Sequence, residues 1–459
     1  MPEAEVNSSR HHLARDLTVS HASSVVVGTI IGTGIFLVPR EMMQAVGSAK
    51  LVYLAWIVGG ALSFLGALTY AELGAMKPEA GGEYVYLRDG YGPLAGFVYA
   101  WSTFLIAKPG SIATIAAGMA RILGAFPAFH KLPHTAITSP LPITYAQLLA
   151  IALVVVVSFI NYIGVKRAGE FQLFFTLLKV GLVLAVIAVA FTYTGGGTAN
   201  YATVFEGAKG GIVGFMIAML AALWAYDGWN NLNMVAGEIR QPERSIPIAL
   251  IAGVGTVAAL YMLMNAALQY VMPASAIAAT GSPAADAMRI ALGAGAASIF
   301  TLVMGFQMLA TLNGSILSGA RVPFAAAHDG YFFPALARVH PRYRTPSAAI
   351  IFQAALAIVL VLAVGKFQAL FSITLFAEWL FYMLTTSTVF IFRRREPDTP
   401  RPYRVWGYPV VPALFILASA VLLYYTFSDN VRNSLLGSLI MLAGIPVYYL
   451  FAARRAAGN

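Results

Sequence analysis

GTIIGTGIF, residues 28–36, lies in the middle of the first long apolar run of this sequence. Three glycines (Gly28, Gly32 and Gly34) and two threonines fall within seven of these residues. Glycine in a helix interior costs roughly 1 kcal/mol relative to alanine. The cluster therefore predicts a local break in an otherwise continuous helix.

In a bilayer, unwound backbone is tolerated only where protein buries it or where it lines a wet cavity. The amides of Gly32, Thr33 and Gly34 would then begin a half-helix, whose positive end is a site for a carboxylate. The alternative is a packing face of small residues for helix–helix contact.

The composition is that of a membrane protein. Of 459 residues, 59% are hydrophobic and 10% are charged, and cysteine is absent, which excludes disulfides, thiol chemistry and cysteine metal sites. Runs of about 20 apolar residues, long enough to cross a bilayer, recur along the whole chain. An all-α polytopic protein with twelve transmembrane helices is expected, with runs at 20–47, 51–76, 94–124, 143–162, 170–193, 211–236, 246–271, 289–326, 346–364, 368–392, 409–427 and 434–452.

The net charge of +10 is distributed as in a membrane topology rather than as in a nucleic-acid-binding surface. With residues 1–19 as a cytoplasmic tail, eighteen Lys and Arg fall on the cytoplasmic side and seven on the outer side. This bias predicts that both termini are cytoplasmic.

A second break is expected in the sixth apolar run, where WAYDGWNN at 224–231 places Asp227 and Gly228 at mid-span. Corresponding breaks in two halves indicate a transporter built from inverted repeats, with substrate between the broken helices. The repeats would be 20–193 (helices 1–5) and 211–392 (helices 6–10), followed by helices 11–12 at 409–452. Lys179 lies within the fifth run, where the alternative to a buried role is snorkelling to the interface.

Several segments resemble the L-type amino-acid transporters of the amino acid–polyamine–organocation superfamily. They include VGTIIGTGIFLVP, YAELG, AKPGS and LWAYDGWNNLNMVAGEIRQPERSIPIAL, and the resemblance covers about residues 18–427. The branch most similar is that of the cystine and basic amino-acid exchangers, which shares the aspartate of WAYDGWN and the Lys-Pro pair of the third run.

The resemblance implies a LeuT-like fold with a 5+5 inverted repeat, and sodium-independent exchange of basic and neutral L-amino acids by alternating access. It implies that Lys179 replaces a sodium ion and that Trp224 closes over the substrate from outside. The substrate-binding residues that it implies are Thr29, Ile31, Gly32, Thr33, Gly34, Trp224, Ala225, Asp227 and Asn230. No catalytic residue, metal or cofactor is expected.

Two features depart from the family pattern. Gly237-Glu238 replaces a Glu-Glu pair after helix 6, which leaves the charge network of the inner gate undefined. The chain also lacks the cysteine through which animal members attach a heavy subunit. A prokaryotic inner-membrane relative that works alone is expected, with amino acids and the lipid bilayer as partners, and with neither nucleic acid nor a disulfide-linked subunit.

Two questions stay open at the level of the sequence. Asp227 either pairs with the side-chain cation of a basic substrate or neutralises Lys108 or Lys179. The rival function is a proton-coupled amino-acid or polyamine symporter of the same fold, with Asp227 or Glu378 carrying the proton. A channel and a membrane enzyme are disfavoured, because neither a filter-like loop nor a cluster of catalytic groups is apparent.

Overall fold

The computed structural model describes residues 13–124, 126, 131–132, 134–137, 142–363, 367–429 and 431–458. Within them the chain is helical apart from a short hairpin of β1 (Thr135–Ile137) and β2 (Ile143–Thr144). The N-terminal half contains α2 (Val19–Ile30), α3 (Gly34–Val46), α4 (Ala49–Met76), α5 (Glu83–Tyr91), α6 (Pro93–Ser102), η1 (Thr103–Ala107), α7 (Lys108–Gly124), α8 (Tyr145–Tyr162), α9 (Val165–Thr192) and η3 (Thr198–Ala202). The C-terminal half contains α10 (Gly211–Ala225), α11 (Asn231–Met234), η4 (Ala236–Glu238), α12 (Pro242–Val271), α13 (Ala274–Ala279), α14 (Pro283–Leu292), α15 (Ala294–Gly319), α16 (Arg321–His328), η5 (Pro334–Ala337), α17 (Ser347–Ala363), α18 (Phe367–Arg395), α19 (Val410–Asp429) and α20 (Val431–Gly458).

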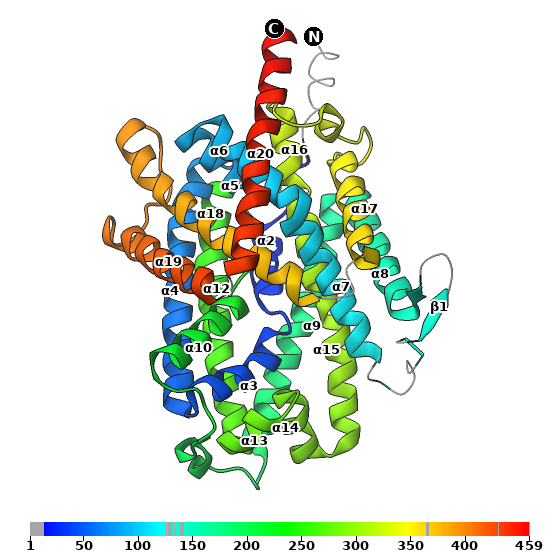
Figure 1. The fold of residues 1–459 in the computed structure, drawn as a ribbon, viewed down its shortest axis with the longest axis vertical. Coiled ribbons are helices and arrows are strands. Elements are labelled where there is room, and N and C mark those ends of the chain that lie inside the picture. The colour runs from blue at the N-terminus through cyan, green and yellow to red at the C-terminus, as the bar shows by residue number, and fades with distance from the viewer. Residues whose placement is uncertain are drawn as a thin grey trace.

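Long helices run along the length of the molecule (Figure 1). The end of α20 and α16 lie at one end, and α13 and α14 lie at the other. By length and composition, nine helical segments in the described part of the chain are suited to cross a membrane. The expected runs at 211–236, 346–364 and 368–392 are not among the nine, and α10 and α17 are the shorter apolar helices there.

The first span is broken where the glycine cluster predicted. Helix α2 ends at Ile30, Ile31 is extended (φ −69°, ψ 91°), and α3 begins at Gly34. The sixth run is broken as well, because α10 ends at Ala225 and turns lead to α11 at Asn231. Gly228 in these turns has φ +108°, a conformation that favours glycine.

The third span contains a feature that was not predicted from the sequence. Between α6 and α7, residues Thr103–Ala107 form a π-helix, which ends directly before Lys108. Single-turn π segments inside α-helices are often found at functional sites.

The broken spans lie in the core of the molecule. Helix α2 packs against α9 and α12, and α10 packs against α3 and α4. Helix α4 also packs against α12, α7 against α15, and α8 against α17. The two breaks are therefore held side by side by unbroken helices.

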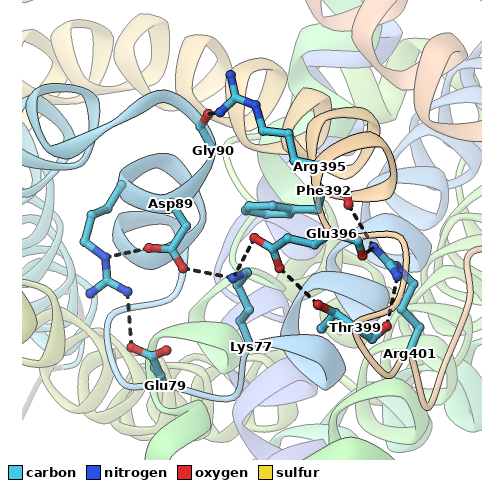
Figure 2. A network of polar contacts seen from close by, with 10 residues as sticks. Lys77, Glu79, Asp89, Gly90, Phe392, Arg395, Glu396, Thr399 and Arg401 are labelled. Carbon is cyan, nitrogen blue, oxygen red and sulfur yellow. Dashed lines mark hydrogen bonds and ion pairs between the residues drawn. The ribbon is translucent and has the colours of Figure 1, made fainter.

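Charged side chains tie the helices together at the end that carries α16. Lys77 bridges Asp89 (3.1 Å) and Glu396 (3.3 Å), which joins the α4–α5 turn and α5 to the residue after α18 (Figure 2). Glu72 is 1% exposed and accepts two hydrogen bonds from Arg393, at 2.9 and 2.7 Å. This pair fixes the end of α4 and favours a structural role for Glu72.

Helix α5 is also joined to the end of α16. Arg88 pairs with Asp329 at 2.5 Å, and the Tyr84 hydroxyl donates to the same carboxylate at 2.8 Å. Burial and the neighbouring Asp329 raise the pKa of the Tyr84 phenol above its ordinary value. The hydroxyl therefore stays protonated and remains a donor.

Candidate functional site

A cavity of about 350 Å³ lies between the two breaks, and we call it the central cavity. Its walls come from both broken spans, α7, α15 and one residue each of η1 and α18. Seven of the predicted substrate-binding residues line it: Thr29, Gly32, Thr33, Gly34, Trp224, Ala225 and Asp227. In the described part of the chain, no group of His, Cys, Asp or Glu is placed to hold a metal ion.

The glycines of the first break have different surroundings. A Cβ at Gly32 would meet no atom closer than 4.0 Å, so this residue faces open space in the cavity. A Cβ at Gly28 would lie 2.2 Å from Thr176 Oγ1, and a Cβ at Gly34 would lie 3.1 Å from the Cβ of Ala225. Gly28 and Gly34 thus allow close helix packing, while Gly32 leaves room for a ligand.

The backbone amides at this break have no partners. Within the described residues, the N–H groups of Gly32, Thr33 and Gly34 make no hydrogen bond. They begin the 13-residue helix α3, where the helix dipole favours an anion. The arrangement can therefore bind a carboxylate without a fixed positive side chain.

The two breaks are bonded to each other. Thr29 Oγ1 lies 2.9 Å from the carbonyl oxygen of Gly228 and 2.6 Å from that of Val25 in its own helix, so its one hydrogen can reach either acceptor. The hydroxyl of Tyr261, on α12, lies 3.0 Å from the Ile30 carbonyl oxygen and 2.9 Å from that of Ala225. One tyrosine thus contacts the C-terminal end of the first half-helix in both broken spans and couples their positions.

Lys179 is fully buried on α9, which excludes snorkelling to the interface. Its ammonium donates to the Gly28 carbonyl oxygen at 2.7 Å and to Thr311 Oγ1 at 2.8 Å. Carbonyl and hydroxyl oxygens are the ligands that a hard cation uses. The ammonium therefore occupies a cation position beside the first break.

Asp227 is bound by a tyrosine rather than by a lysine. Tyr382 on α18 donates its hydroxyl to Asp227 Oδ1 at 2.7 Å. Lys108 instead donates to Asn231 Oδ1, which also accepts from Ser318 at 2.8 Å. Within the described chain, no Lys, Arg or His nitrogen lies within 4.0 Å of the Asp227 carboxylate.

Two predicted residues lie outside the central cavity. Ile31 is completely buried and is absent from the cavity wall, so its contribution would come from the backbone. Asn230 lines a neighbouring hollow of about 40 Å³, which we call the side pocket. Glu83, at the start of α5, also lines this pocket and is fully buried.

Several residues of the site were missed by sequence reasoning. Thr311 and Ser315 on α15 line the cavity, and Ser318 supports Asn231. These three lie at positions i, i+4 and i+7 of an otherwise apolar helix, a spacing that places them on one face. That polar stripe was the available signal.

The end of the cavity nearest α16 is closed. Leu17 N donates to Glu238 O at 3.0 Å and Arg240 N donates to Leu17 O at 2.8 Å, so the segment before α2 is paired with the chain after η4. Arg321 donates to both Glu238 carboxylate oxygens, at 2.6 and 3.0 Å, and both side chains are completely buried. Glu238 is therefore paired without the second glutamate of the family pattern.

A sequence model described as amino acid permease matches residues 17–452. The chain belongs to the amino acid permease family. It is a multi-pass membrane transporter rather than an enzyme, and the resemblance seen in the sequence is confirmed.

Individual permeases match over nearly the whole chain. The human b(0,+)-type amino acid transporter 1 is 32% identical over 96% of this chain and 88% of its own length. The serine/threonine exchanger SteT of Bacillus subtilis is 32% identical over 97% of this chain and 98% of its own length. The human cystine/glutamate transporter is 30% identical over 96% of this chain and 85% of its own length.

Proposed function

We propose that this permease is a sodium-independent exchanger of basic and neutral L-amino acids that works by alternating access. The observation that carries the proposal is the set of unpaired amides at Gly32, Thr33 and Gly34, which face a cavity between two broken helices. They suit the α-carboxylate that every amino acid shares. Relatives named as amino-acid transporters and exchangers support the same substrate class.

The Lys179 ammonium supports sodium independence. It donates to the Gly28 carbonyl oxygen at the first break and so fills a position that a sodium ion would otherwise occupy. This amine is part of the chain, so no ion gradient is needed to place it there.

A LeuT-like arrangement of twelve spans, as a 5+5 inverted repeat, remains our proposal for the architecture. The helix contacts support it because they are reciprocal under a shift of five spans. Helix α2 of span 1 packs on α12 of span 7, as α10 of span 6 packs on α4 of span 2. Span 3 also packs on span 8 (α7 on α15), and span 4 on span 9 (α8 on α17).

We infer that both termini are cytoplasmic, in the inner membrane of a cell. The excess of Lys and Arg on one side supports this orientation. The central cavity reaches Glu41 and Arg121, away from the closed end near Glu238. With this orientation the end near Glu238 and Arg321 faces the cytoplasm, and the end near Glu41 and Arg121 faces the outside. No cysteine in this sequence can link a heavy subunit.

We propose that Asp227 reads the charge of the substrate side chain. Asp227 lines the cavity and has a hydroxyl rather than a base as its partner, which supports this role over that of a counter-ion for Lys108 or Lys179. Removing one partner of a desolvated charge pair costs on the order of 2–5 kcal/mol.

The test is exchange of labelled amino acids in proteoliposomes, with and without internal amino acid, sodium gradients and proton gradients. Asp227→Asn is expected to lower the affinity for arginine at least about tenfold and to spare alanine and leucine. Uptake that depends strictly on sodium or on a proton gradient contradicts the exchanger. If Asp227→Asn lowers the affinity for every substrate equally, or prevents folding, Asp227 is a structural counter-ion instead.

A further inference from the structure

The side pocket adjoins the central cavity. Ala107, Lys108 and Glu378 line both hollows and so form the boundary between them. At about 40 Å³ the side pocket has room for about three water-sized groups. It can receive the tip of a side chain that enters from the central cavity, but not a whole amino acid.

The walls of the side pocket match a long aliphatic side chain. They include Ile106 and Ala107 from the π-helix Thr103–Ala107, Phe381 from α18 and Met441 from α20. Methylene groups of a lysine or arginine side chain are stabilised against such surfaces while their charged tips reach polar partners.

Among the described residues that line this pocket, one buried side-chain atom has no hydrogen-bond partner, and it is an acceptor. Asn230 is 2% exposed, and its Oδ1 has no hydrogen-bond donor, while its Nδ2 donates to Glu83 Oε1 at 2.8 Å. The Tyr99 hydroxyl is already used, since it donates to Glu83 Oε2 at 2.7 Å. A buried acceptor without a donor is costly, so the missing group is a donor.

Charge points to the same ligand. Two carboxylates, Glu83 and Glu378, line the side pocket, and Lys108 is the only Lys, Arg or His among the described residues of its lining. In the described chain, none of the three forms an ion pair within 4.0 Å. Carboxylates at this depth of a membrane protein require a cationic or hydrogen-bonding partner. Glu83 has such partners in Asn230 and Tyr99, which leaves Glu378 as the carboxylate for a ligand.

Glu378 is placed to act with Asp227. Tyr382 follows Glu378 by four residues on α18, so both side chains lie on one helix face, and the Tyr382 hydroxyl contacts Asp227. A cation at the boundary of the two hollows is therefore close to two carboxylates, Glu378 on α18 and Asp227 in the broken sixth span.

We propose that the side pocket binds the side-chain cation of a basic amino acid, with Glu378 and the Asn230 Oδ1 atom as its hydrogen-bond acceptors. The assignment rests on the proposed amino-acid exchange and adds to it the place where substrate charge is read. A lysine ammonium has three donors and an arginine guanidinium has five, and the side pocket offers the acceptors.

Two variants of the full chain test the proposal by different means. Glu378→Gln removes the charge and keeps the shape. Ala377→Leu adds volume to the side pocket alone and changes no charge, because Ala377 does not line the central cavity. Glu206→Gln, at an exposed site far along the chain from the pocket lining, is the matched control for net charge.

Binding of lysine, arginine, alanine and serine is measured by calorimetric titration of the purified protein in detergent. Both test variants are expected to lower the affinity for lysine and arginine at least about tenfold, and to change the affinity for alanine and serine by less than about twofold. The control is expected to match the wild type for all four.

An equal loss for all four ligands, or no loss for lysine and arginine, overturns the side-pocket assignment and leaves exchange intact. A wild type that binds alanine and serine but neither basic amino acid overturns it as well. A wild type that binds no amino acid overturns the proposed function itself.

Discussion

The buried pair of Arg321 and Glu238 offers the sharpest test of how the closed end is held. Two guanidinium nitrogens meet the two carboxylate oxygens, a third donates to Leu317 O at 2.7 Å, and neither side chain is exposed. Removing one member leaves the other charge buried without a partner, which costs about 3–5 kcal/mol. Glu238→Gln and Arg321→Met should each destabilise the protein by about this amount.

The double variant should recover much of the loss, because no unpaired charge remains. The matched control is the exposed pair at the same end of the molecule, Arg240 and Asp16, whose side chains are 57% and 40% exposed and 3.1 Å apart. Asp16→Asn should cost no more than about 1 kcal/mol.

Unfolding in detergent, followed by tryptophan fluorescence, ranks the four proteins. Additive losses in the double variant would refute the reasoning, and so would a Glu238→Gln protein as stable as Asp16→Asn. Because the chain has no cysteine, Ser24→Cys on α2 adds a single reporter that is buried in this state. Breaking the Arg321–Glu238 pair should increase the labelling of this cysteine by a thiol reagent applied from the closed end.

Three further predictions concern the breaks and the topology. Lys179→Ala should abolish transport, since the Gly28 carbonyl loses its cationic donor, and strictly sodium-driven uptake by the wild type would contradict this role. Gly32→Val should abolish binding in a folded protein, because its side chain enters the cavity, whereas Gly28→Ala should impair folding, because its Cβ meets α9. Thermal-shift titrations separate the two, and unchanged affinity for Gly32→Val would return that glycine to a packing role. Reporters fused at Gly458 and in the 125–142 loop should lie on opposite sides of the membrane, and finding both on one side would overturn the topology.

Local chemistry made the two breaks predictable from the sequence. The residue types at each break disfavour a continuous apolar helix at that very position. They are the clustered glycines in the first span, and Asp227 and Gly228 in the sixth. The positions of the apolar runs were predictable for the same reason. Their number was harder to judge, because α10 ends at its break and is too short to pass as a span by itself.

Partners between distant segments were not predictable. The residue that Glu83 contacts, Asn230, is 147 positions away in the chain. The sequence around Tyr261 does not indicate that its hydroxyl contacts both breaks. The π-helix at 103–107 contains neither glycine nor proline. Pro109, which follows it, indicates a disturbed helix but does not specify a π-helix.

The unpaired groups of the empty site give a reason why the carrier should exchange one amino acid for another, rather than release its substrate and return empty. Three amides at Gly32, Thr33 and Gly34 and the Oδ1 atom of Asn230 have no partner among the described residues. Each buried group left unsatisfied costs about 1–3 kcal/mol, so closing over a dry, empty cavity would cost about 4–12 kcal/mol. The carboxylate of any bound amino acid satisfies the amides, and a basic side chain also satisfies Asn230, so the loaded carrier should pass through the closed state much faster than the empty one. Efflux of preloaded substrate should therefore be slow into buffer and at least about tenfold faster into buffer that contains an amino acid, and equal rates would remove this account of exchange.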